Sequence, residues 1–253
     1  MTGKFYLPLL RPLVILLGLL IIWQLVVWAT QAPHYILPAP QRVLSALLNN
    51  FSLLLYHAGV TLSEILLGLL LGTFLGGVSA LLIASFAPLR RWLLPVFVVS
   101  QAIPVFALAP LLVLWIGYGM ASKVAMAVLI IYFPVTAAFF DGLRRTDHGW
   151  LDLARTMDAS AWALLWRIRV PAALPALASG LRVATAVAPI GAVVGEWVGA
   201  SSGLGYLMLY SNARMQIDLL FAALFILALL ALALYYAVDR LCQRMTPWSI
   251  DKR

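Results

Sequence analysis

The chain has 253 residues, of which 64% are hydrophobic and only 10% are charged, and its mean hydropathy is +1.01. Soluble globular domains are about 45–50% apolar and about 25% charged, so this composition excludes an ordinary soluble domain and predicts an integral membrane protein. The net charge is +8. In a membrane protein the positions of the basic residues matter more than their sum, so we do not take this charge as a sign of nucleic-acid binding and predict no nucleic-acid partner.

Six apolar stretches follow one another along the chain, and each is long enough to cross a bilayer as a helix of about 20 residues. A lone strand would leave its backbone groups unsatisfied in lipid, so we predict an all-α protein. The first stretch is too long for the apolar part of a signal peptide and is expected to remain as a span. The predicted spans, in one transmembrane domain of residues 1–253, are 12–30, 61–87, 92–116, 121–140, 175–199 and 217–240.

The segment 38–58, between the first two spans, is too interrupted by polar residues to cross the membrane. Its apolar residues recur at helical spacing, with Val43, Leu44, Leu47 and Leu48 as the clearest set. This pattern predicts an amphipathic helix that lies on the outer membrane surface.

The basic residues indicate the orientation. With the N-terminus inside, all but three of the 17 Lys and Arg residues fall on the inner side, and the exceptions are Arg42, Lys123 and Arg214. Cytoplasmic loops carry an excess of Lys and Arg, so we predict that both termini are cytoplasmic. The 141–174 loop then faces the cytoplasm as well.

The second and fifth spans each contain three glycines at four-residue spacing, and we call each set a glycine ladder. This spacing places the glycines on one helix face and permits close approach of a neighbouring backbone. One interpretation is static helix packing, and the other is that these faces re-pack during a conformational cycle. The ladders consist of Gly68, Gly72 and Gly76, and of Gly191, Gly195 and Gly199.

Two carboxylates, Glu64 and Glu196, fall within spans and towards their outer ends. Charged side chains inside a membrane are costly and often functional. Either they form ion pairs near the interface, or they line an outer vestibule of a translocation path. We predict that Glu64, Glu196, Gly195 and Gly199 contribute to that path.

Catalytic motifs are absent from the sequence. It has no Walker lysine loop, no HExxH motif and no Gly-x-Ser-x-Gly elbow. His34, His57 and His148 are widely scattered, and Cys242 is the single cysteine. We therefore predict a chain that is not an enzyme, with no metal site and no cofactor of its own.

A polar segment, LDLARTMDASAWALLWRIRVPAALP at residues 151–175, interrupts this hydrophobic chain. Leu151, Ala154 and Met157 form one apolar edge, and a second edge follows at helical spacing from Ala161 to Ile168. Asp158 separates them, and Asp tolerates the left-handed conformation and can cap a following helix. We predict two short helices with a turn at Asp158, after which Pro171 and Pro175 begin the next span.

The spacing of this segment resembles the EAA loop of ABC-importer permeases: EAA, three residues, Gly, nine residues, Ile, one residue, Leu-Pro. Asp152, Leu153 and Ala154 stand at the EAA positions, Asp158 at the glycine, and Ile168 to Pro171 at the ending. The sequence departs from the pattern in having Asp for the usual Glu and Asp158 for the corner glycine. The resemblance assigns an ATPase-coupling role to Asp152, Leu153, Ala154, Asp158, Ala161, Leu164, Ile168 and Pro171.

Further motifs resemble import permeases of the nitrate, sulfonate and taurine type. They include LPAP at 37–40, IP at 103–104, ALAPL at 107–111, GLR at 180–182 and EWVGASSGLGY at 196–206. Two segments, GAVVGEWVGASSGLGYLM and NARMQIDLLFAALF, are most similar to the sequences of the branch that imports thiamine-precursor pyrimidines.

The resemblance implies a type I ABC importer in the inner membrane of a bacterium. Two permease subunits, expected to be identical, would form the path for a small solute such as a hydroxymethylpyrimidine-like compound. Two cytoplasmic ATPases, which hold ATP and Mg, would bind the inner surface, and an extracytoplasmic binding protein would deliver the solute.

Three alternatives remain open from the residues alone. The same mechanism could import sulfonate, taurine or nitrate, or the chain could be an ion-coupled secondary transporter or a structural membrane subunit. A secondary transporter would favour inverted repeats and acids at the membrane midplane, and we find neither.

Overall fold

The computed structural model of the chain describes residues 7–86, 88–92, 95, 99 and 103–248. Every regular element in that part of the chain is a helix, as the composition predicts. The elements are α1 (Leu7–Thr30), α2 (Pro40–Asn49), α3 (Phe51–Ser85), α5 (Val105–Ile116), α6 (Met120–Arg144), α7 (His148–Thr156), α8 (Ala161–Leu164), a π-helical turn (Leu165–Arg169), α9 (Val170–Gly199), α10 (Leu204–Ala213) and α11 (Ile217–Met245).

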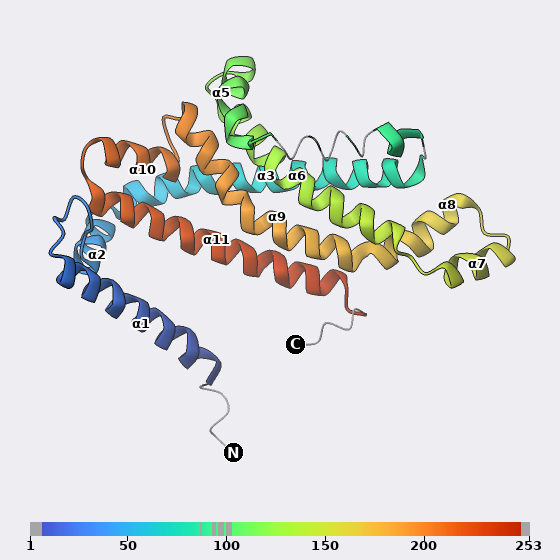
Figure 1. Ribbon diagram of the computed structural model, residues 1–253, viewed down its shortest axis with the longest axis horizontal. Helices are drawn as coiled ribbons and strands as arrows, with labels where there is room; N and C mark the ends of the chain where they lie inside the picture. The colour runs from blue at the N-terminus through green and yellow to red at the C-terminus, as the bar shows by residue number, and fades with distance from the viewer. Residues whose placement is uncertain (1–6, 87, 93–94, 96–98, 100–102, 249–253) are drawn as a thin grey trace.

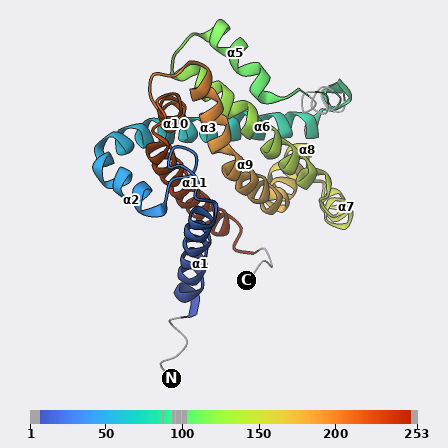
Figure 2. The ribbon, with the colours of Figure 1, turned by 60° about the vertical axis from the view of Figure 1, so that its left-hand side comes forward.

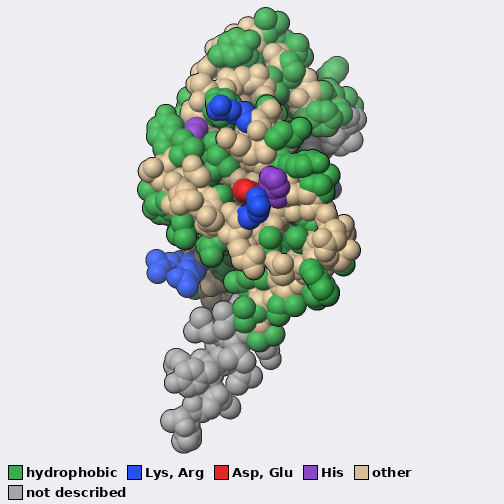
Figure 3. All heavy atoms as spheres, turned by 90° about the vertical axis from the view of Figure 1, so that its left-hand side faces the viewer, with side chains coloured by type: hydrophobic (Ala, Val, Ile, Leu, Met, Phe, Trp, Pro, Cys, Tyr) green, Lys and Arg blue, Asp and Glu red, His purple; other side chains and the backbone are tan. Residues whose placement is uncertain are grey.

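The long helices α3, α6, α9 and α11 run alongside one another and form an elongated bundle (Figure 1). The short helices lie at its ends: α2 and α10 at one end, called here the α10 end, and α7 and α8 at the other, called the α7 end. Helix α1 leads away from the bundle (Figure 2), and the rings of Trp23 and Phe221 stack 5.6 Å apart where it meets α11. Figure 3 looks onto the α10 end, where hydrophobic and uncharged side chains predominate.

Four of the six predicted spans correspond to helices that are long and apolar enough to cross a membrane. These are α3, α6, α11 and a continuous helix, Ala161–Gly199, which joins α8 to α9 through the π-helical turn. The first predicted span falls in α1, and α5 contains the end of the third. The earlier part of the third span, at 93–94, 96–98 and 100–102, lies outside the described residues.

The predicted surface helix 38–58 is wrong in its length. Only α2 is separate, because the backbone of Asn50 (φ −116°, ψ 24°) breaks the helix there. Residues 51–58 instead form the first turns of α3, where Leu54 and Ala58 are buried in a cluster with α10 and α11. Tertiary packing therefore extends the second span beyond its hydropathy boundary.

Pro171 lies in the first turn of α9, and the helix runs on from α8 through the π-helical turn into α9 without a break. Pro171 has no N–H, and its ring would clash with the carbonyl four residues earlier in an α-helix. The wider π-helical turn at Leu165–Arg169 directly precedes this proline and accommodates it within an unbroken helix.

The glycine ladders bring α3 and α9 against α6. A Cβ atom on Gly68 would lie 2.5 Å from the Cβ of Ala127, and one on Gly191 would lie 2.8 Å from the Cα of the same alanine. Farther along α3, Cβ atoms on Gly72 and Gly76 would approach Ile131 to 2.7 Å and the carbonyl oxygen of Tyr132 to 3.1 Å. These four glycines therefore lie at close helix contacts, as the packing interpretation requires.

The core beside these contacts consists of small and branched apolar side chains. Ile65, Ala127, Ile131, Val135, Ala184, Ala188 and Ala192 are all fully buried there. A side-chain hydrogen bond links α9 to α11: the Nε atom of Arg182 of α9 donates to Oδ1 of Asp239 of α11 at 2.6 Å.

We predict that Gly191→Ala destabilises the protein by about 1–3 kcal/mol, because the new methyl group would overlap the backbone of Ala127. Gly77→Ala is the matched control, since a Cβ there meets nothing within 4 Å and Ala favours a helix by about 1 kcal/mol over Gly. Thermal unfolding of the detergent-purified variants measures both effects. Equal unfolding midpoints for the two variants would contradict the close contact.

Candidate functional site

The polar segment forms a helix–turn–helix at the α7 end. Asp147 caps α7 by accepting the Gly149 N–H at 2.6 Å, and Ser160 caps α8 by accepting the Ala163 N–H at 3.2 Å. The expectation that Asp158 caps the second helix is therefore corrected, because Ser160 stands at the N-cap position. The role of Asp158 is to turn the chain, with φ 56° in the left-handed region.

The turn at Asp158 is a Schellman motif. The Ala159 N–H donates to the Ala154 carbonyl and the Asp158 N–H donates to the Arg155 carbonyl, both at 3.0 Å. Glycine is the usual residue at the left-handed position of this motif, and Asp is one of the few others that tolerates it. Asp158 therefore occupies a left-handed position that a glycine would also adopt.

An apolar surface is exposed on the segment, and we call it the α7 patch. It comprises Trp150, Leu153 and Met157, whose exposed fractions are 58%, 64% and 75%. It borders a groove of about 730 Å³ against Ile168, Pro171 and Trp248. Contiguous exposed apolar surface on a segment that also carries several charges is typical of a protein interaction site.

The eight residues that were predicted to couple to an ATPase differ in their exposure to solvent. Asp152, Leu153, Asp158 and Ala161 are exposed, whereas Leu164, Ile168 and Pro171 are half-buried and Ala154 is buried. Ala154 is the buried residue of α7 and lines the groove of about 730 Å³. Trp150 was missed, although it stands three residues before Leu153 and seven before Met157 on the same helix face.

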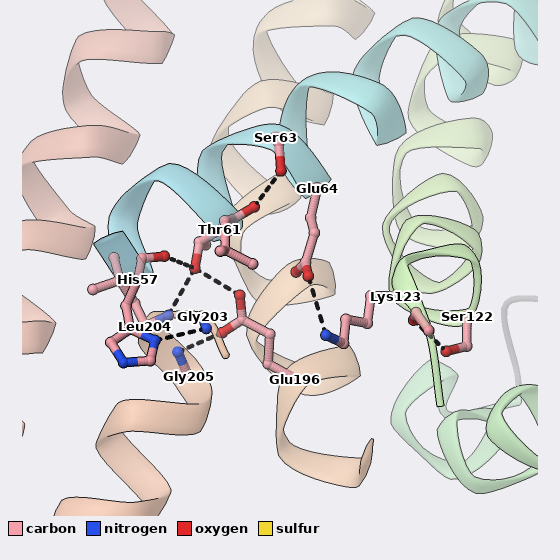
Figure 4. A network of polar contacts seen from close by, with 12 residues as sticks. His57, Thr61, Ser63, Glu64, Ser122, Lys123, Glu196, Gly203, Leu204 and Gly205 are labelled. Carbon is pink, nitrogen blue, oxygen red and sulfur yellow. Dashed lines mark hydrogen bonds and ion pairs between the residues drawn. The ribbon is translucent and has the colours of Figure 1, made fainter. Parts of the chain in front are cut away.

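A second candidate site is a polar cluster buried near the α10 end (Figure 4). Glu64 of α3 lies 3.5 Å from the Nζ atom of Lys123 of α6, with side-chain exposures of 0% and 7%. Neither carboxylate oxygen of Glu64 has a hydrogen-bond partner among the described residues. A charge pair of this kind is separated from solvent and depends on both members.

The same cluster caps the N-terminus of α10. Three successive backbone N–H groups donate to side chains: Gly203 to His57 Nδ1 at 3.0 Å, Leu204 to Thr61 Oγ1 at 2.8 Å, and Gly205 to Glu196 Oε2 at 2.5 Å. A helix N-terminus leaves N–H groups unsatisfied and favours a negative charge, so the Glu196 carboxylate suits this position.

Thr61 and two glycines complete this arrangement. The Thr61 hydroxyl donates to Glu196 Oε1 at 2.6 Å, which joins α3 to α9. Gly203 has φ 110°, and a Cβ at either Gly203 or Gly205 would overlap the Glu196 carboxylate. The motif that follows Glu196 in the sequence therefore builds the cradle in which its carboxylate lies.

The expectation that Glu64 and Glu196 face an open path is not met in this structure. Their exposed fractions are 0% and 1%, because α3, α6, α9 and α10 enclose them. Gly195 packs on the Lys123 backbone, and Gly199 packs on Val113 and Tyr118. For Glu64, the structure shows the ion pair that was the alternative interpretation, and its partner is Lys123.

His57 and Thr61 were not predicted as members of the site. A signal was present, since His57, Thr61 and Glu64 stand at i, i+4 and i+7 and form a polar stripe on an apolar helix. Arg214 lies elsewhere, with its guanidinium over the ring of Tyr210 and a hydrogen bond to the Tyr210 hydroxyl. No group of three or more potential metal ligands occurs within the described ranges.

Comparisons with known proteins identify relatives across nearly the whole chain. The profile of the family described as "Binding-protein-dependent transport system inner membrane component" matches residues 68–247. A Haemophilus influenzae protein named "Probable ABC transporter permease protein" is 60% identical, over 96% of this chain and 98% of that protein. The formylaminopyrimidine transport permease protein ThiX of Halalkalibacterium halodurans is 39% identical, over 94% of this chain and 96% of ThiX.

Similarity extends to a taurine permease and to a solved structure. The taurine transport system permease protein TauC of Escherichia coli is 29% identical, over 97% of this chain and 93% of TauC. An inward-facing structure of the MetNI methionine ABC transporter superposes with a TM-score of 0.68 at 19% identity. The superposition covers 78% of this chain and 98% of that one. This likeness shows a shared fold.

We predict that Lys123→Met destabilises the protein by about 3–5 kcal/mol, because it leaves the Glu64 carboxylate buried without its cation. The double variant Glu64→Leu/Lys123→Met should recover most of that loss, since an apolar pair of similar size replaces both charges. Arg42→Met is the control, because it breaks a partly exposed pair with Asp218 at 3.9 Å and should cost at most about 1 kcal/mol. Thermal unfolding of the four proteins tests this, and a Lys123→Met variant as stable as Arg42→Met would refute it.

Proposed function

Because the chain belongs to the family of binding-protein-dependent transport system inner membrane components, we propose that its α7–α8 segment is the docking site for an ATPase. The chain itself is a multi-pass membrane permease subunit of an ABC importer, which excludes an ion-coupled secondary transporter. Importers of this family work with ATPase subunits and an extracytoplasmic binding protein. The proposal concerns which part of this chain meets the ATPase and which solute passes.

The α7 patch is the observation that carries the docking proposal. Its three exposed apolar side chains lie on α7 and at its C-terminal cap, outside the long spans, with Asp152 and Arg155 beside them. Capped helices and a hydrogen-bonded turn hold the patch in one shape, so it can enter a complementary groove with little loss of conformational freedom.

The continuous helix Ala161–Gly199 supports a mechanical role for the docked segment. Its 39 residues extend over roughly 58 Å, from α8 at the α7 end to Glu196 beside α10. Movement of the ATPase against α8 would therefore tilt a helix whose far end carries the buried polar cluster. Switching of this kind requires an element with two arrangements that the partner favours unequally.

We further propose that two identical copies form the path, and that both termini face the cytoplasm. The excess of Lys and Arg at the α7 end supports the orientation, together with the sparsely charged α10 end in Figure 3. On α5, which lies at the edge of the bundle, Leu114 and Trp115 have exposed fractions of 78% and 72%. A second copy or lipid must cover side chains of this kind.

The proposed solute is a thiamine-precursor pyrimidine. The relative that transports formylaminopyrimidine is 39% identical, whereas the taurine permease is 29% identical over a similar share of the chain. Sulfonate, taurine and nitrate are the alternative solutes, and they would use the same mechanism.

We expect Leu153→Asp/Met157→Asp to reduce co-purification with the cognate ATPase at least tenfold, because two charges would be placed in the apolar contact. Leu44→Asp/Leu48→Asp is the matched control, as these leucines are 57% and 66% exposed on α2 at the opposite end. Affinity pull-down from detergent extracts measures the retained ATPase. Equal retention by the two double variants would exclude the α7 patch as the docking site.

The solute prediction is tested by ATP-driven uptake into proteoliposomes that contain the permease, its ATPase and its binding protein. Labelled formylaminopyrimidine should accumulate, and a hundredfold excess of unlabelled taurine, alkanesulfonate or nitrate should leave the rate unchanged. Accumulation of taurine, sulfonate or nitrate without pyrimidine uptake would assign the chain to the alternative class.

A further inference from the structure

A second groove lies at the α7 end, between the end of α3 and the α8–π-helical segment, and we call it the Arg169 groove. It has a volume of about 540 Å³. One wall is formed by α3 and the residue after it, with Val78, Leu82 and Phe86. The opposite wall carries Trp162, Trp166 and Arg169.

The groove lies where a span ends. Val78 and Leu82 belong to α3, which is apolar enough to cross the membrane, and both side chains are exposed there. The rings of Trp162 and Trp166 lie 5.4 Å apart on the facing wall. Trp side chains are enriched at the boundary between hydrocarbon and headgroups, so the groove is placed to receive part of a lipid.

Two arginines lie at or beside this groove, Arg169 in its lining and Arg90 beyond its α3 wall. Arg169 donates from Nε and Nη2 to the Leu143 carbonyl at 3.2 and 3.0 Å, and burial and, to a smaller extent, the positive charge of Arg90 act against its own charge. Arg90 is exposed and follows Phe86 by one helical turn. In the described part of the chain, neither guanidinium forms an ion pair with a carboxylate.

We propose that the Arg169 groove binds an anionic phospholipid, with the phosphate between Arg90 and Arg169 and an acyl chain along the apolar walls. A phosphate would neutralise the charge of the two arginines and accept charge-assisted hydrogen bonds from them. Basic pockets between membrane helices bind anionic headgroups in this way. A zwitterionic lipid offers the same hydrocarbon and lacks the net negative charge, so it should bind more weakly.

The π-helical turn shapes this site. It spans Leu165–Arg169 and lies between the α8 and α9 portions of one continuous helix. Leu165, Trp166 and Arg169 all line the groove. Helical turns of this type occur often at functional sites. Here the turn carries Trp166, which would contact the acyl chain, and Arg169, which would bind the phosphate.

The test uses the purified full-length chain in detergent, titrated with phosphatidylglycerol or phosphatidylcholine and followed by native mass spectrometry. We expect saturable, tighter binding of phosphatidylglycerol. Arg90→Gln should weaken it about fivefold, the factor that corresponds to about 1 kcal/mol per basic residue near an anionic surface. Arg169→Gln should weaken it at least as much, and Arg90→Gln remains informative if loss of the Leu143 contact impairs folding of the Arg169 variant.

Arg244→Gln is the matched control, because Arg244 is exposed at the end of α11, a helix that contributes no residue to the groove. It should bind phosphatidylglycerol like the parent protein. Equal affinity for the two lipids, or an equal loss in Arg90→Gln and Arg244→Gln, would overturn the proposal. Displacement of phosphatidylglycerol by millimolar inorganic phosphate would also overturn it, because the site would then bind phosphate without lipid. These outcomes are independent of ATPase docking.

Discussion

The close approach of α3 and α9 to α6 is the contact on which the rest of this structure depends. Hydrocarbon surrounds the spans, so burial of apolar surface does little to hold one helix against another there. Association depends on contact between backbones, and Ala127 of α6 receives such contacts from both sides, from Gly68 and from Gly191. Larger side chains at these two glycines would separate the helices and remove the dispersion contacts that hold the bundle together.

The buried polar cluster is a consequence of this close packing. Glu64, Lys123 and Glu196 come from three helices, and their side chains meet only because glycines let those helices approach. Once enclosed, the charges need partners, and the N-terminus of α10 supplies hydrogen-bond donors to Glu196. The short helix α10 is thereby joined through side chains to α3 and α9, in addition to its apolar contacts with α11.

The sequence predicts those features that depend on local composition and spacing. Hydropathy locates α3, α6, α9 and α11, and the pattern around Asp158 predicts a turn that the structure shows with its left-handed backbone. The sequence does not predict features that arise from tertiary contact. Residues 51–58 extend α3 because they pack on α10 and α11, and Glu196 is buried because Thr61, Gly203 and Gly205 surround it. Neither outcome is determined by the apolar pattern of one helix.

These contacts bear on whether the glycine faces are static or re-pack during transport. At Ala127 the Gly68 contact is with the Cβ atom and the Gly191 contact is with the Cα atom, so sliding of α3 or α9 along α6 would bring larger groups against an atom with no room beside it. The hydrogen bond from Thr61 to Glu196 and the capped α10 add a second constraint at the far end of α9. Under the proposed docking role, force applied at α8 therefore moves α3, α6, α9 and α10 together, as one body. The rearrangement between transport states then falls at surfaces without such contacts, where α1 lies at the edge of the bundle and where two copies would meet.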